Sequence, residues 1–281
     1  MSKFNQNDKA FVPVSKIEGM ENYHSALYET RVLEITDRTV KISLPEGKDQ
    51  WIASSLVQKN IGILVLEIGD LETETSLLDP LAKSVLQYCR LLLPDDYVRS
   101  YKIRSLNELS IIWQKEKDIY SHIVLIGHGR KDGIVFVNQE IIYPDKFSDH
   151  LTNSNTQKIF ISLCCQTGYQ DMGGKFSKII DVCSHFIAPF HSIHGAAASQ
   201  FIQTFLAFHL LKGRTVKTAF NNAYRTPDGK TFRLWENGEL KAGADRRKSS
   251  KSKPQPASPP TTCVAAPHTS PAGGTNFKTE V

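Results

Sequence analysis

Two residues capable of nucleophilic chemistry stand at the ends of apolar segments. His128 follows the apolar run at residues 123 to 126 and precedes Gly129. Cys165 likewise closes an apolar run, at residues 159 to 165. A thiol that becomes a thiolate, an imidazole that moves protons and amides that hold an oxyanion are the parts of nucleophilic hydrolysis. Because Gly129 has no side chain, its backbone amide can approach a substrate carbonyl closely.

Each residue alone also has a purely structural explanation. A histidine beside glycine is common in turns, and a buried cysteine usually behaves as a small apolar residue. The pair gains weight because both residues are expected at strand ends, where open parallel sheets form their sites. We assign Cys165 as the nucleophile and Cys164 as a packed neighbour. The Cys165 amide, expected at the start of a helix, would be a second oxyanion donor.

These segments resemble a known family. Residues 127 to 129 and 164 to 168 resemble the His-Gly and Ala-Cys-Glu-Thr-Gly motifs of CHAT domains, relatives of caspases and separases. Residues 132 to 140 resemble the hairpin after the family histidine, and residues 196 to 213 resemble its long helix near the C-terminal end. The resemblance covers roughly residues 60 to 226.

The resemblance implies a cysteine endopeptidase that acts on a protein substrate, is regulated by a partner protein and needs no cofactor. It implies a caspase-like three-layer sandwich with a mostly parallel central sheet. By the family pattern His128 is the base, Cys165 is the nucleophile, and the amides of Gly129 and Cys165 form the oxyanion hole. Such domains often work in multi-component systems, including bacterial defence and cell death.

The sequence departs from the family at three places. Cys164 stands where alanine is usual. Leu163 stands where relatives that cut after Arg or Lys often carry an acid, so a basic preference is not carried over. Residues 192 to 195 read Ser-Ile-His-Gly instead of the frequent Pro-Val-x-Asp turn. We assign Leu163 and His194 to substrate binding.

Strand and helix patterns alternate after residue 60, which predicts crossover connections and a parallel sheet. Helical spacing predicts helices that follow most of the strands, and Ser105 with Glu108 has the spacing of a capping box. Strands are predicted at residues 61–68, 97–103, 122–126, 158–163 and 185–188. Helices are predicted at residues 77–93, 105–117, 145–152, 195–211 and 216–224, with a hairpin at 231–240.

Composition divides the chain further. Residues 1–20 are polar and predict a disordered arm, and period-two alternation at 24–58 predicts a small β-barrel-like module. The peptidase domain is expected at 60–240. Residues 243–281, rich in Lys, Ser and Pro, predict a disordered basic tail. Seven basic and two acidic side chains after residue 240 account for the formal net charge of +5.

Other classes fit the sequence less well. The histidines at 191 and 194 match no firm zinc spacing, and no metal site is predicted. The five cysteines have no disulfide spacing, and no secretory or membrane segment is found, so we expect a cytoplasmic location. Nucleic-acid binding is expected only weakly, through the basic tail. The main alternative function is a catalytically silent scaffold or adaptor that binds a partner protein.

Overall fold

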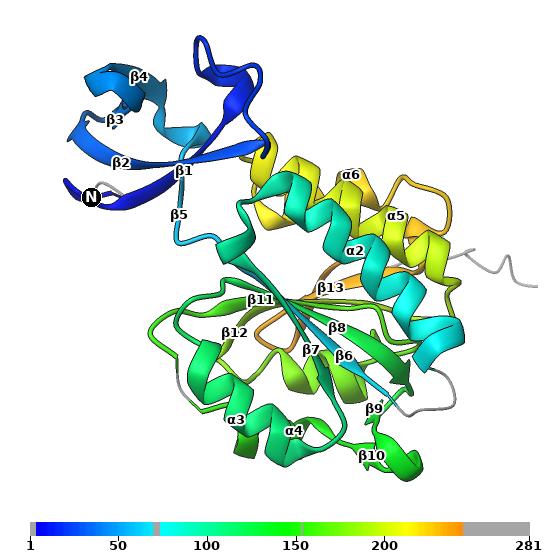
Figure 1. Ribbon diagram of the computed structural model, residues 1–281. Coiled ribbons are helices and arrows are strands. Elements are labelled where there is room, and N and C mark those ends of the chain that lie inside the picture. Colours follow the sequence, from blue (N-terminus) through cyan, green and yellow to red (C-terminus); the bar gives the residue numbers. More distant parts are fainter. Residues whose placement is uncertain (1–3, 70–73, 153, 244–281) are drawn as a thin grey trace, which may run out of the picture. The chain divides into compact units, whose positions relative to one another are not determined.

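The larger part of the fold is a central sheet with helices on both faces (Figure 1). The computed structural model describes residues 4–69, 74–152 and 154–243. The parallel part has the order β7-β6-β8-β11-β12, and β13 and β14 extend it antiparallel. The strands are β6 (Ile63–Ile68), β7 (Val98–Ile103), β8 (His122–Gly129), β11 (Lys158–Ser162), β12 (Cys183–Pro189), β13 (Phe232–Glu236) and β14 (Glu239–Ala242). The predicted mixed α/β fold with a mostly parallel sheet is confirmed.

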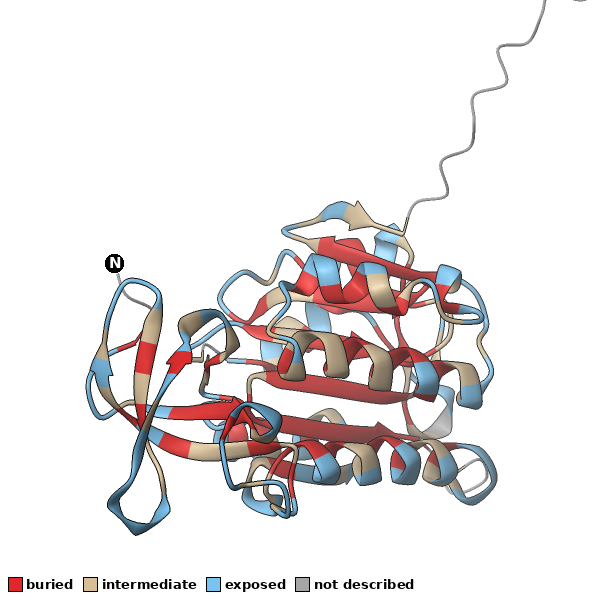
Figure 2. Ribbon diagram, turned by 90° about the horizontal axis from the view of Figure 1, so that it is seen from above, coloured by how far each residue is buried: buried red, intermediate tan, exposed pale blue. Residues whose placement is uncertain are grey.

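Apolar side chains on alternate positions of each strand fill two separate cores. One core joins Val65 and Ile161 to α2, α5 and α6, and the other joins Leu66 and Phe160 to α3 and α4. The buried strands lie between helices whose outer faces are exposed (Figure 2). The helices are α2 (Asp79–Leu92), α3 (Leu106–Glu116), α4 (Pro144–His150), α5 (Gly195–Leu206) and α6 (Val216–Ala223).

Local signals set several element boundaries. The predicted capping box at the start of α3 is present, because the Ser105 hydroxyl accepts from the Glu108 amide at 3.2 Å and the Glu108 carboxylate accepts from the Ser105 amide. The expected hairpin after β8 is also present as β9 (Ile134–Val135) and β10 (Ile141–Ile142). It continues the sheet beyond the end of β6, along the same edge of β8.

A second, antiparallel sheet precedes the parallel one, in the order β4-β3-β2-β1-β5. Its inner face has an apolar cluster of its own. The five strands make no closing β4–β5 pair within the described residues, so the barrel stays a prediction. The strands are β1 (Lys9–Pro13), β2 (Leu27–Ile35), β3 (Thr39–Ser43), β4 (Asp49–Ala53) and β5 (Gln58–Lys59).

The expected disordered arm at residues 1–20 contains β1 instead. Its apolar run, residues 10–12, is too short to show a period in sequence, yet it is fully buried because β2 pairs with it. Phe11 belongs to the core that α2 covers and meets Tyr97 edge to face, with ring centroids 4.8 Å apart. The first strand therefore ties the small sheet to the larger one.

The predicted disordered tail at 243–281 lies outside the described residues except for Gly243. None of the helices in the described part of the chain has the length and apolar character that crossing a lipid bilayer requires.

Candidate active site

The two predicted catalytic residues leave neighbouring parallel strands at matching positions. Leu125 of β8 lies opposite Ser162 of β11, and the Leu163 amide donates to the Leu125 carbonyl at 2.8 Å. His128 and Cys165 each come three residues after that registered pair. Parallel strands end at the same edge of a sheet, so both residues lie at the edge where α/β folds form their sites.

The chain turns directly after Cys165 instead of entering a helix. Residues 165–168 form a turn, and the first helical turn begins only at Gln170. Gln166 adopts a left-handed backbone, with φ 63°, which is uncommon for a residue with a side chain. The expected helix N-terminus at Cys165 is therefore wrong. The change from apolar to polar residues after Cys165 marked the end of the strand but did not distinguish a turn from a helix.

A closed ring of hydrogen bonds fixes this turn. The Thr167 hydroxyl donates to the Cys164 carbonyl at 2.8 Å, and the Cys164 amide donates to the Ser162 hydroxyl at 3.2 Å. The two hydroxyl oxygens lie 2.8 Å apart, and the Thr167 hydrogen is already used, so Ser162 is the donor between them. Ser162 and Thr167 are fully buried. Ser162 within the apolar segment and Thr167 shortly after it were the sequence signal for the ring, although the ring was not predicted from them.

Two further contacts anchor the turn to the neighbouring strands. The Gly168 amide donates to the Pro189 carbonyl at 2.8 Å, and the Trp235 indole donates to the Gly168 carbonyl at 2.9 Å. A β-carbon on Gly168 would lie 2.7 Å from the Ala188 carbonyl oxygen, so only glycine fits there. The turn that carries Cys165 thus rests on β12 and β13.

Gly129 lies against the same turn. A β-carbon on Gly129 would collide with the Cys165 carbonyl oxygen, and it would stand 2.8 Å from Cys164 Cβ and Thr167 Cγ2. The Arg130 amide donates to the Gly133 carbonyl at 2.9 Å. Because hydrogen-bonded and non-bonded pairs alternate in an antiparallel ladder, the neighbouring Gly129 amide is directed away from β9. That side of β8 carries β11 and the turn with Cys165.

The described cysteines differ sharply in exposure. Cys165 is half-buried, whereas the other three are buried, and none forms a disulfide. Burial raises the pKa of both Cys89 and Cys164 to about 12 and raises the pKa of Cys183 further. A thiol with such a pKa is inert at neutral pH. Of the described cysteines, only Cys165 is partly exposed, whereas Cys164 is fully buried, as expected of a packed neighbour.

The Cys165 sulfur meets the loop before α5. The Ile193 amide donates to Cys165 Sγ at 3.4 Å, and the Ile193 carbonyl oxygen lies 3.8 Å from the same sulfur. The next residue, His194, is exposed, and its Nδ1 accepts from the Ala196 amide at 3.3 Å as the N-cap of α5. His194 therefore follows directly after a residue that contacts the Cys165 sulfur.

The second residue assigned to substrate binding, Leu163, is placed differently. Its side chain is 3% exposed and belongs to the core beneath α2 and α5. Leu163 supports the site from below, and its burial argues against direct contact with substrate.

A cavity of about 320 Å³ opens beside His194, between the start of α2 and the start of α5. It was not predicted from sequence, because its walls come from segments more than a hundred residues apart. Its lining residues are Ser76, Leu77, Pro80, Leu81, Ser84, His194, Gly195, Ala196 and Ser199.

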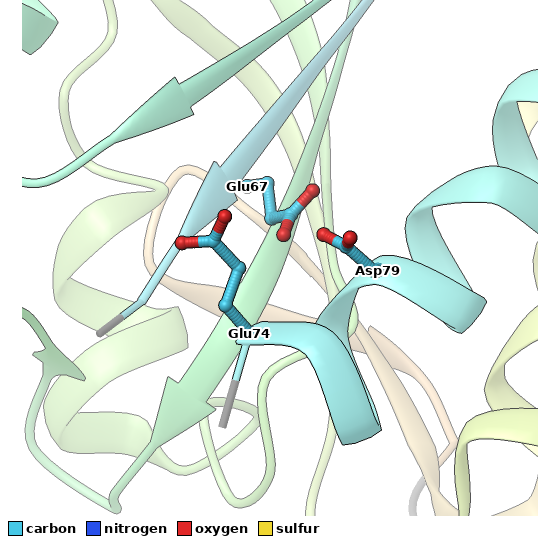
Figure 3. Close-up of side chains that lie close together, drawn as sticks. All are labelled: Glu67, Glu74 and Asp79. Atoms are coloured by element: carbon cyan, nitrogen blue, oxygen red, sulfur yellow. The ribbon is translucent and has the colours of Figure 1, made fainter. Parts of the chain in front are cut away.

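Three carboxylates gather at the end of β6, one strand from His128 (Figure 3). One carboxylate oxygen from each of Glu67, Glu74 and Asp79 lies within 4.8 Å of the other two. This spacing would allow the three carboxylates to bind one cation. However, Lys102 already pairs with Glu74 and Asp79, the latter at 2.8 Å, and Arg104 pairs with Glu74 at 2.9 Å. The cluster therefore has cationic partners from the protein itself, and it fastens the start of α2 to β7.

The Glu67 carboxyl of this cluster binds a proton more readily than an ordinary glutamate. Burial, followed by a hydrogen bond with Asp79, raises the pKa of Glu67 to about 7. The Lys102 ammonium holds the pKa values of Glu74 and Asp79 below their usual range. With Glu67 protonated, the two carboxylates of Glu74 and Asp79 balance the two cations Lys102 and Arg104, so these five side chains together carry no net charge.

Comparisons with known proteins add little. No family model matches the sequence, and no curated protein matches it. The chain is similar to a solved structure described as a secreted C11 cysteine protease from Bacteroides thetaiotaomicron in complex with an irreversible peptide inhibitor. The identity is 9%, 63% of this chain is covered, and the TM-score is 0.44. This chain spans 66% of that protease chain. At this TM-score the likeness carries no weight for activity.

Proposed function

We propose that this chain is a caspase-like, CHAT-type cysteine endopeptidase that uses Cys165 and His128. The observation that carries the proposal is the meeting of two strand ends. Cys165, the half-buried cysteine of the described set, stands on a hydrogen-bonded turn that packs against the glycine following His128. A reactive thiol needs access, a base nearby and fixed amide donors, and this edge of the sheet supplies a setting for all three.

The proposed reaction proceeds in two halves. His128 takes the Cys165 proton, the thiolate attacks the peptide carbonyl carbon to form a C–S bond, and the carbonyl π electrons move to oxygen. The amides of Gly129 and Cys165 stabilise that oxyanion. Collapse breaks the C–N bond as His128 protonates the leaving amine. Water, deprotonated by His128, then attacks the thioester carbonyl, and the departing thiolate regains its proton.

The substrate is proposed to be a protein, cut under the control of a partner within a multi-component system such as bacterial defence or cell death, in the cytoplasm. The small antiparallel sheet and the basic tail are the segments proposed for docking. A catalytically silent adaptor with the same fold is the alternative, and the reactivity of Cys165 separates the two.

The test measures the iodoacetamide labelling rate of each cysteine between pH 6 and pH 7. Wild type is compared with His128→Ala and with a matched control, His191→Ala, which removes an exposed imidazole from a neighbouring loop. We expect fast labelling at Cys165 that His128→Ala slows and His191→Ala does not. Substrate profiling of wild type against Cys165→Ala, with partner proteins present, then identifies the cleaved protein. Labelling of Cys165 no faster than that of Cys89 or Cys263 would favour the adaptor.

A further inference from the structure

The cavity beside His194 combines an apolar wall with a few serine hydroxyls. Leu77, Pro80 and Leu81 supply an apolar wall from the start of α2. The opposite wall is the start of α5, where Gly195 and Ala196 bring little more than backbone. Among the residues that the structure describes, the cavity lining contains no Asp, Glu, Lys or Arg. A ligand group that enters it meets mainly carbon.

The hydroxyls of Ser84 and Ser199 in the cavity lining already have partners. Ser84 Oγ and Ser199 Oγ lie 2.8 Å apart, and the Gln203 amide nitrogen donates to Ser199 Oγ at 2.8 Å. The charges of the neighbouring segment are also engaged elsewhere, since Glu74 and Asp79 pair with Lys102. A charged side chain in this cavity would lose water without gaining a carboxylate, ammonium or guanidinium partner from the described lining, which disfavours its binding.

The cavity is joined to the proposed nucleophile by a single residue. Ile193 contacts Cys165 Sγ through its amide at 3.4 Å, and His194 and Gly195, the next two residues, line the cavity. In a substrate whose carbonyl carbon bonds to that sulfur, the side chain of the same residue stands on the Cα next to the carbonyl. The cavity is therefore within reach of that side chain.

Gly195 keeps the cavity open. A β-carbon built at this position would find only Leu81 Cβ, at 3.9 Å, which is ordinary van der Waals contact. The space between the two helix starts is thus wide enough for atoms that the chain itself does not provide. The same observation makes Gly195 a position where the cavity can be filled without a backbone clash.

We propose that this cavity binds an uncharged, apolar side chain, of the size of leucine, on the substrate residue that carries the scissile carbonyl. The proposal rests on the proposed peptidase function and adds its substrate class. Burial of such a side chain against Leu77 and Leu81 should favour a leucine-bearing substrate over a glycine-bearing one about tenfold.

The test uses activity-based probes on the full chain. Four acyloxymethyl ketones differ only in the residue beside the reactive carbonyl, which is Leu, Gly, Arg or Asp, and intact-mass spectrometry follows their addition to Cys165. Wild type is expected to react with the Leu probe about tenfold faster than with the Gly probe, and more slowly still with the Arg and Asp probes. Faster labelling by the Arg or Asp probe would overturn the apolar pocket while leaving the peptidase intact.

Variants locate the selectivity in this cavity. Gly195→Val fills the space and is expected to lower the Leu-to-Gly rate ratio about tenfold, with the milder Gly195→Ala in between. Leu77→Asp adds an acid to the wall and is expected to raise the Arg-to-Leu ratio. Its matched control is Leu91→Asp, an exposed leucine near the other end of α2 that does not line this cavity. Unchanged ratios in folded Gly195→Val would overturn the proposal.

Failure of the proposed peptidase function and failure of the proposed substrate class would give different results. If no probe labels Cys165 in any variant, or if labelling is insensitive to His128→Ala, the peptidase function itself is wrong. If labelling depends on His128 but the probe ratios ignore residues 77 and 195, only the substrate class is wrong.

Discussion

The carbonyl oxygen of Cys165 occupies the space where a β-carbon on Gly129 would stand. The end of β8 and the turn after β11 are therefore packed directly against each other, with the Cys165 carbonyl nearest to Gly129. This relationship couples the residue that follows the proposed base to the residue that carries the proposed nucleophile. It also explains why glycine is required after His128 in physical terms, since any side chain would push the turn away.

Gly129→Ala should displace the turn that carries Cys165. The added methyl group must move the Cys165 carbonyl or the side chain of Thr167, and overpacking of this kind costs roughly 1 to 3 kcal/mol of unfolding free energy. Chemical denaturation measures the loss, and iodoacetamide labelling of Cys165 should slow in parallel. Gly195→Ala, where the new β-carbon has room, serves as the matched glycine control. Equal stabilities for the two variants would contradict this account.

Thr167→Val should weaken the turn by removing one hydroxyl from the buried ring. Valine keeps the shape of threonine but leaves the Cys164 carbonyl and the Ser162 hydroxyl with one partner fewer, which costs about 1 to 3 kcal/mol. Thr167→Ser restores the hydroxyl and should recover most of the Cys165 labelling rate, although it leaves a small void. A Ser variant no better than Val would show that packing, rather than the hydrogen bonds, holds the turn.

Cysteine labelling at pH 8 should single out Cys165 among the described cysteines. Burial raises the pKa of Cys89 and Cys164 to about 12, so the native protein exposes almost no thiolate at either position. We expect one alkylated site in a Cys263→Ser background, identified by peptide mass spectrometry, and four sites after denaturation in urea. Native labelling of Cys164 at the rate of Cys165 would show that the turn opens.

Much of this arrangement could be predicted from sequence because the signals are local. The continuous apolar run of β6 identified a strand buried on both faces, and Ser105 with Glu108 identified the start of α3. The strand ends at His128 and Cys165 followed from the change from apolar residues to glycine-containing loops. Each of these patterns lies within a dozen residues.

The parts that sequence did not predict depend on distant segments. β1 was missed because a three-residue apolar run becomes a strand only when β2 pairs with it. The helix expected at Cys165 is a turn because Ser162 and Thr167 close a ring of hydrogen bonds around it. Leu163 was assigned to substrate, but it is buried because β11 continues into the core through its bond to Leu125. The cavity between α2 and α5 requires the tertiary fold.

Glu67→Gln should change how stability depends on pH. The folded-state pKa of Glu67, raised to about 7 by burial and by Asp79, lies above the usual value of 4.5. The folded state therefore binds more protons than the unfolded state between those values, so this contribution is complete below about pH 4.5 and is lost as pH rises through 7. Glutamine resembles the protonated carboxyl, can still donate to Asp79, and does not titrate.

The stability of Glu67→Gln relative to wild type should consequently increase as pH rises. Urea denaturation at intervals from pH 5 to pH 8 should give a difference in unfolding free energy, variant minus wild type, that increases by roughly 1 to 3 kcal/mol across this range. The groups that face Glu67, namely Glu74, Asp79 and Lys102, are the same in both proteins, so the difference isolates the Glu67 proton. Glu18→Gln serves as the exposed control. A difference that stays flat or falls with pH would mean that Glu67 is ionised throughout, with Lys102 as its partner.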